Sequence, residues 1–111
     1  MTMELSKKDK KTAREIIEKG LQTEYVKGLK RFDSILQQWK NKTIDNREAY
    51  MQLYESVRKH DKHIARRYDG MTGSKYLMII AAQLADGILT DADLENFSDE
   101  VKQLIKLWSE G

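Results

Sequence analysis

The sequence predicts an all-α protein: a long antiparallel helical hairpin, a buried third helix and a short C-terminal helical section, together a bundle of four or five helices. Three observations predict this fold class. Hydrophobic residues recur at steps of three and four over long stretches, which is the spacing of one face of an α-helix. The 111 residues include no proline, so no helix lacks a backbone donor for that reason. No stretch alternates apolar and polar residues as a half-buried strand would.

The first long helix is expected to start its buried part near Ile17. Gly28 lies on the hydrophobic stripe, where a missing side chain lets another part of the chain approach closely. Gly20 lies off the stripe and should cost about 1 kcal/mol relative to alanine without visible return. The stripe is about 120° wide on a helical wheel and consists, besides Gly28, of Ile17, Leu21, Tyr25, Leu29, Phe32, Ile35, Leu36 and Trp39.

The polar N-terminus and the break after the first helix set the domain organisation. Residues 1–12 have no stripe, although Ser6 could cap a helix, so we expect a flexible N-terminal tail. Residues 13–111 are expected to form a single helical-bundle domain. The segment NKTID, residues 41–45, ends the first helix, and Asp45 followed by Glu48 fits a capping box at the start of the second.

The second helix is expected to run to Tyr68, with Gly70 as a left-handed C-terminal cap. Its stripe should face the stripe of the first helix and join the two into an antiparallel hairpin. That second stripe consists of Tyr50, Leu53, Tyr54, Val57, Ile64 and Tyr68.

Two further helical segments complete the predicted fold. KYLMIIAAQLADG, residues 75–87, is apolar nearly all round, which predicts a buried helix that ends at Gly87. Residues 90–110 have one hydrophobic stripe but two possible starts, at Thr90 and at Ser98, so they form one helix with a soft joint or two short ones. We expect two.

Composition excludes several classes of function. With no cysteine there is no disulfide framework, thiolate nucleophile or cysteine-ligated zinc, and a reducing cytoplasm is the natural compartment. The longest apolar run, residues 76–82, is too short to cross a bilayer, so we expect no membrane contact. Residues 1–70 carry 17 Lys and Arg against 11 acids, and residues 71–111 carry 3 against 7. This basic front and acidic back could attract each other or form distinct surfaces.

The stretch RKHDKHIARRYDGMTGS, residues 58–74, holds two histidines and is the first place to look for chemistry. His60 and His63 lack the further converging ligands that a metal ion needs, and Ser56 with His60 lacks the third group of a hydrolase. DADLENFSDEVK, residues 91–102, lacks the glycine and the final glutamate of a calcium loop. We therefore expect no catalytic residue, no metal site and no cofactor.

Two surfaces remain as candidates for binding. Lys59, Lys62, His63 and Arg66 form a basic face that could follow phosphates, although it also reads as an ordinary solvated helix surface, because acids such as Glu55 share it.

Asp61 falls inside the second apolar stripe, where an unpaired carboxylate is costly. Either it pairs with Arg14 or a tyrosine hydroxyl, or the third helix does not cover that region. A pocket or partner surface would then be lined by Asp61, Arg67, Tyr68 and Tyr25.

The sequence thus predicts a non-catalytic, cytoplasmic accessory module that binds another protein, or a second copy of itself, through the hairpin. The hairpin is longer than about forty C-terminal residues can cover, so apolar stripe should be left over for a partner. The alternatives are a nucleic-acid-associated module that uses the basic face and, less favoured still, an enzyme.

Overall fold

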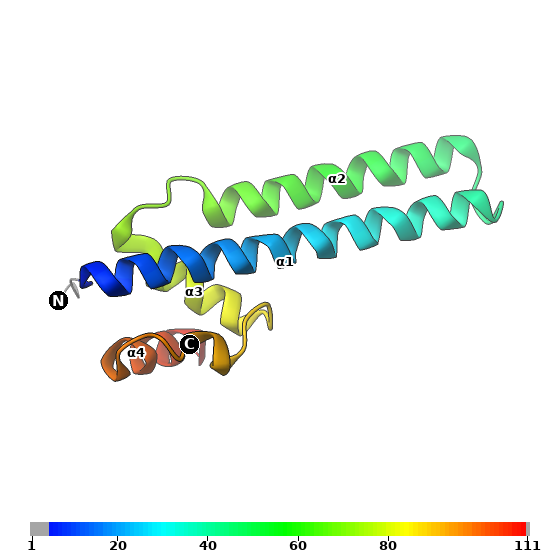
Figure 1. Cartoon of the computed structure of the whole chain (residues 1–111). Helices are drawn as coiled ribbons and strands as arrows, with labels where there is room; N and C mark the ends of the chain where they lie inside the picture. Colours follow the sequence, from blue (N-terminus) through cyan, green and yellow to red (C-terminus); the bar gives the residue numbers. More distant parts are fainter. Residues whose placement is uncertain (1–4, 111) are drawn as a thin grey trace. The chain divides into compact units, whose positions relative to one another are not determined.

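The protein is all-helical, as predicted (Figure 1). In this computed structural model, which describes residues 5–110, four α-helices and two short 3₁₀ helices account for the regular structure, and no strand occurs within that range. The elements are, in order, α1 (Lys7–Lys40), α2 (Asn46–Tyr68), the 3₁₀ helix η1 (Gly73–Lys75), α3 (Tyr76–Ala85), the 3₁₀ helix η2 (Asp91–Leu94) and α4 (Asp99–Glu110).

The helices fall into two compact units, and α1 passes through both. One unit, Glu24–Asp69, is the antiparallel hairpin of the second half of α1 with α2. The other combines the described parts of Met1–Thr23 and Gly70–Gly111. The predicted single domain over residues 13–111 stays a prediction.

Helix α1 begins earlier than its hydrophobic stripe. Ser6 Oγ accepts a hydrogen bond from the backbone N–H of Asp9 at 3.0 Å, which satisfies one of the free amides of the first turn. Leu5, Asp9 and Ala13 are buried. Residues 7–12, expected in a flexible tail, are therefore helical, and the expected tail's first four residues lie outside the described range. Hydrophobic periodicity did not detect this first part of α1, because two of its inward-facing residues are an aspartate and an alanine, Asp9 and Ala13.

The turn between α1 and α2 is closed by backbone hydrogen bonds at the end of α1. Thr43 N–H donates to Gln38 O at 2.9 Å and Lys42 N–H to Trp39 O at 3.0 Å, which is the Schellman arrangement. Lys42 takes the left-handed position, at φ 60°, where glycine is usual. The predicted cap at Asp45 is confirmed: its carboxylate accepts from the Glu48 N–H at 2.7 Å.

In the unit without the hairpin, α3 lies between the N-terminal part of α1 and α4 (Figure 1). Its Ile80 is fully buried. Gln83, equally buried, donates from Nε2 to the Ile17 carbonyl at 3.1 Å. A Cβ at Gly20 would lie 2.7 Å from Gln83 Cδ. The sequence predicted that Gly20 lowers helix stability without any packing benefit. That prediction is wrong, because the missing side chain makes room for the Gln83 amide.

The C-terminal section consists of two helices, η2 and α4, as expected. Thr90 and Asp93 hold the start of η2, with Thr90 N–H donating to Asp93 Oδ2 at 2.8 Å. Gly70 and Gly87 both adopt positive φ, at 69° and 72°, which confirms them as the left-handed residues that follow α2 and α3.

Candidate functional site

The inner face of the hairpin is built from small and polar residues. A Cβ at Gly28 of α1 would lie 2.7 Å from the ring atoms of His60 of α2, so the two helices approach closely there. The His60 ring also meets the Phe32 ring edge-on, with centroids 5.9 Å apart. Along the rest of the hairpin Ile35 and Ala49 are buried. Small residues at the contact allow a short distance between helix axes.

Glu24 anchors the open end of this inner face. Its side chain is only 4% exposed, and Oε1 accepts from Arg67 Nη1 at 2.8 Å and contacts His63 Nε2 at 2.7 Å. The Tyr68 hydroxyl donates to Oε2. One turn earlier on α2, His60 Nε2 meets the Glu24 carbonyl oxygen at 3.0 Å. A buried carboxylate needs such partners, because desolvation of an unpaired charge is costly.

This network was not predicted from the sequence. The signal was present: Glu24 stands seven residues after Ile17 and four before Gly28, in register with the buried positions of α1. The partners recur on α2 at His60, His63 and Arg67, again at helical spacing. A polar network on the inner face of a helix pair leaves no trace in a hydrophobic periodicity, because the pattern counts only apolar residues.

The four residues predicted to line a partner pocket lie in different surroundings. Arg67 and Tyr68 are half-buried and bind Glu24. Asp61 and Tyr25 are exposed, and Asp61 forms no ion pair within the described residues. The structure thus supports the alternative in which the region around Asp61 is uncovered, while partner binding by these residues stays a prediction.

The predicted contact between the two apolar stripes is wrong over most of α2. Tyr50, Tyr54 and Val57 are 73%, 58% and 45% exposed. They stand one position after the inward-facing residues Ala49, Leu53 and Ser56, which turns them by about 100° to one side of the hairpin. The inward-facing side of α2 is occupied instead by Ala49, Ser56 and His60, and the His60 ring fits over Gly28, where α1 has no side chain.

The displaced stripes of both helices lie on the same side of the hairpin. On α1 the exposed residues again follow the inward positions Glu24, Gly28 and Ile35 by one. Seen along the hairpin, α1 and α2 run in opposite directions, so their residues advance around the helix axes in opposite senses. The residue that follows an inward-facing residue therefore projects to the same side of the hairpin on both helices. We call this surface the apolar face; it consists of Tyr25, Leu29, Leu36, Trp39, Tyr50, Tyr54 and Val57.

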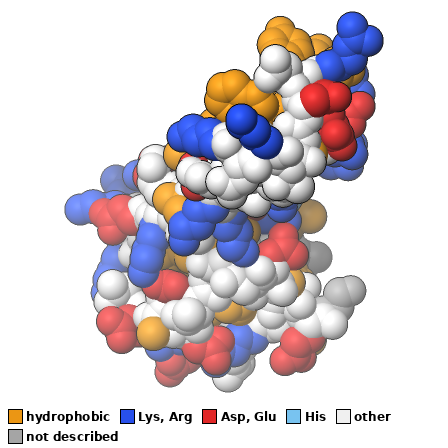
Figure 2. Space-filling model, turned by 90° about the vertical axis from the view of Figure 1, so that its right-hand side faces the viewer, with side chains coloured by type: hydrophobic (Ala, Val, Ile, Leu, Met, Phe, Trp, Pro, Cys, Tyr) orange, Lys and Arg blue, Asp and Glu red, His pale blue; other side chains and the backbone are white. Residues whose placement is uncertain are grey.

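Figure 2 looks toward the turn end of the hairpin and shows hydrophobic side chains reaching the surface, with lysine and arginine side chains around them. Seven large hydrophobic residues on a 46-residue hairpin unit, Glu24–Asp69, are at least 36% exposed on this one face. Single exposed hydrophobic residues are normal on protein surfaces, but a set of this size on one face is a candidate for an interaction site.

The predicted basic face exists on the opposite side of α2. Lys59, Lys62 and Arg66 are exposed, and each stands one position before an inward-facing residue of α2. His63, the fourth predicted member, turns toward Glu24 instead. Lys27 and Lys30 of α1 project to the same side by the same reasoning. Glu55, also exposed, interrupts the positive charge. The hairpin therefore has one aromatic side and one mixed, mainly basic side.

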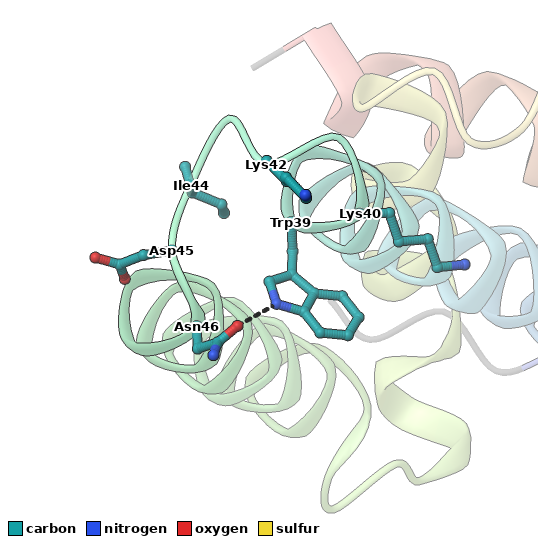
Figure 3. Close-up of a pocket in the computed structure, with 6 residues that line it drawn as sticks. All are labelled: Trp39, Lys40, Lys42, Ile44, Asp45 and Asn46. Carbon is teal, nitrogen blue, oxygen red and sulfur yellow. Dashed lines mark hydrogen bonds between the residues drawn. The ribbon is translucent and has the colours of Figure 1, made fainter.

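The turn of the hairpin forms a pocket beside Trp39 (Figure 3). The indole Nε1 donates to Asn46 Oδ1 at 2.7 Å, which ties the last turn of α1 to the first turn of α2. The other lining residues come from the turn and its flanks: Lys40, Lys42, Ile44 and Asp45. The Trp39 ring, 42% exposed, extends the apolar face to this end of the hairpin.

The described residues show neither a metal-ligand cluster nor a membrane-spanning helix. Among residues 5–110, no three side chains of the types that bind metals converge on one point. None of the helices in that range is both long and apolar enough to span a membrane. Ser56 Oγ is buried and finds no hydrogen-bond partner among the described residues. His60, which the spacing would allow to bond with it, contacts the Glu24 carbonyl oxygen instead.

No protein-family model matches this chain, and neither a curated protein nor a solved structure matches it.

Proposed function

We propose that this protein is a non-catalytic helical interaction module that binds another protein chain through the apolar face of its hairpin. The observation that carries the proposal is the exposure of seven large hydrophobic residues on one side of two rigid helices. Burying apolar area releases about 25 cal/mol per Å², so a partner that covers this face gains a large driving force. Helices present such anchors to a partner at fixed spacing.

The composition of the apolar face supports a protein partner. Three tyrosines and one tryptophan lie within it, and these residue types are enriched at protein interfaces because each combines a large apolar surface with one polar group. The charges that helical spacing places beside it, Asp33, Lys40, Arg47 and Asp61, are of both signs, which favours a protein partner over phosphates. We also propose a cytoplasmic location, supported by the absence of cysteine.

Site-specific photo-cross-linking tests this proposal. A photoreactive amino acid replaces Tyr54 on the apolar face or Glu55, the next residue, on the other side of α2, and each variant is produced in the organism that encodes the protein. We expect protein adducts, identified by mass spectrometry, from position 54 and not from position 55. Equal adduct formation at both positions, or none at position 54, would overturn the proposal.

A second candidate is supported by the basic face. Lys27 and Lys30 of α1 join Lys59, Lys62 and Arg66 of α2 on one side of the hairpin, where they could follow a phosphate backbone. Such binding depends steeply on salt because it releases counterions. Retention of the protein on immobilised heparin or DNA, lost in Lys59→Glu but kept in Tyr54→Ser, would favour this function. If the protein passes through the heparin or DNA column without retention at about 50 mM salt, this second function is excluded.

A further inference from the structure

We infer that the occupant of the apolar face is a second copy of this chain, turned end for end about a two-fold axis near Tyr54. This inference rests on the proposed function, since it names the partner for the same surface. It depends on three properties of the hairpin: the arrangement of charge along α2, the area of the face, and the position of the basic residues at the turn.

The charges along α2 are arranged symmetrically about Tyr54. Arg47 stands seven residues before Tyr54 and Asp61 seven residues after it, so all three project from nearly the same side of the helix. All three are exposed, and on α2 Arg47 and Asp61 are the charged residues that a spacing of seven places in line with Tyr54; on α1 helical spacing places Asp33 and Lys40 beside Leu29 and Leu36. A two-fold axis at Tyr54 brings Arg47 of one copy opposite Asp61 of the other, twice per dimer.

The same axis pairs apolar residues on α1. Contacts between Gly28 and His60, and between Glu24 and the end of α2, fix which residues of the two helices lie level. By that register Tyr54 lies level with the segment just after Phe32, so Leu29 of one copy lies level with the Trp39 region of the other. A self-complementary face of this kind is what a two-fold interface requires.

The area is enough for a weak but specific dimer. The overlapping part of the hairpin is about 17 residues of α2, which is about 25 Å at about 1.5 Å per residue. Two helices about 10 Å apart make a face about 20 Å wide. The product is about 500 Å² per copy and about 1,000 Å² in total, which lies at the lower limit of specific interfaces. We therefore expect a dissociation constant in the micromolar range.

The charges at the turn decide between the two possible orientations. Lys40, Lys42 and Arg47 are exposed at the turn end of the hairpin, as are the acids Asp45 and Glu48. Helical spacing, however, turns Lys40 and Arg47 toward the apolar face and Glu48 toward the opposite side. A dimer with both turns at the same end would bring these cations of the two copies together, and like charges at an interface are unfavourable. Turning one copy end for end separates the basic ends and pairs each with an acid. The resulting assembly is an antiparallel four-helix bundle.

Charge reversal tests the inference in the purified full-length chain. Sedimentation equilibrium from about 5 to 500 µM should show a monomer–dimer equilibrium for the natural protein. Arg47→Asp and Asp61→Arg should each weaken dimerisation about tenfold or more, and the combination of both should restore it, since the pairs are then re-formed with opposite sign. Because Arg47 and Asp61 are exposed, circular dichroism should show all variants folded.

Cysteine cross-linking tests the orientation. The chain has no cysteine of its own, so Tyr54→Cys introduces a single thiol near the proposed axis. We expect rapid disulfide-linked dimers from Tyr54→Cys under mild oxidation, and none from the matched Glu55→Cys on the other side of α2.

Three outcomes would overturn the inference: a monomer at every concentration, a double charge reversal that fails to restore dimerisation, or equal cross-linking at positions 54 and 55. A monomer whose position 54 still cross-links to a different protein in cells would overturn the second copy as partner and leave the proposed function intact. A monomer with no such adduct would overturn both.

Discussion

The imidazole of His60 occupies the space above Gly28, and this contact sets how the hairpin is built. The ring fits there because Gly28 has no side chain, and it also meets the Phe32 ring edge-on. Tyr50 and Tyr54 do not take part in this contact and are exposed on the apolar face.

Gly28→Ala should destabilise the hairpin. The added Cβ would lie 2.7 Å from the His60 ring, which is held by the Glu24 carbonyl and by Phe32. Overpacking of this kind costs about 1–3 kcal/mol, more than the gain of about 1 kcal/mol in helix propensity. Urea unfolding measures the change. Introducing Gly28→Ala together with His60→Ala should remove the penalty, and a penalty that persists in the double variant would contradict the contact.

Glu24→Gln should cost about 3 kcal/mol of unfolding free energy. The change removes the negative charge that faces the Arg67 guanidinium and the Tyr68 hydroxyl in a buried setting, and breaking a buried pair from one side typically costs about 3–5 kcal/mol. Glu55→Gln is the matched control on the exposed side of α2 and should change stability by less than about 0.5 kcal/mol. Equal effects of the two substitutions would show that Glu24 is not a structural anchor.

Ser56→Ala should stabilise the protein by about 1 kcal/mol. The hydroxyl is buried and makes no hydrogen bond among the described residues, so its removal relieves a desolvation cost and adds a better helix former. Thermal unfolding should show a higher midpoint for this variant. A lower midpoint would mean that the hydroxyl has a bound partner in solution.

Asp93 should contribute stability that depends on pH. The hydrogen bond from the Lys19 ammonium, together with the Thr90 N–H, lowers the pKa of the Asp93 carboxyl below its ordinary value near 3.8. The folded state then binds fewer protons than the unfolded state. The contribution is complete above the ordinary value and is lost as the pH falls through and below it. It is modest, because the Lys19 side chain is 66% exposed.

Asp93→Asn tests this directly. At pH 7 it should lower the unfolding free energy by about 0.5–1 kcal/mol, because the amide keeps an acceptor oxygen but loses the charge that faces the partly exposed Lys19 ammonium. At pH 2 the natural protein and the variant should be nearly equal in stability. A difference that is the same at both pH values would show that the carboxylate charge plays no part.

Most of the helical architecture could be predicted from the sequence, because it depends on local signals. Asp45 marks the start of α2 by capping it, Gly70 and Gly87 mark the ends of α2 and α3 through their positive φ, and Thr90 marks η2. Each works through the backbone of a few neighbouring residues. The apolar character of α3 likewise predicted its burial.

The side of α2 that faces inward could not be predicted, because hydrophobic periodicity weights Tyr50 and Tyr54 heavily and gives no weight to Ser56, whose hydroxyl is buried. On α1 the predicted stripe includes Ile17, Gly28 and Ile35, which are buried, and the structure confirms Gly28 as a point of close contact, with His60. The Glu24 network was missed because the periodicity counts only apolar residues. Asp61 was the one useful sign: a carboxylate inside an apolar stripe indicated that the stripe was not covered, and the structure shows it exposed.

The most direct test of this account is the unfolding free energy of Tyr54→Ser, measured by urea denaturation at about 1 µM, where the chain should be monomeric. If Tyr54 belongs to an unoccupied binding face, its loss should change stability by less than about 0.5 kcal/mol, while Ile17→Ala in the buried core should cost about 2–5 kcal/mol. A loss of about 3 kcal/mol or more in Tyr54→Ser would place that residue inside the fold and contradict the apolar face.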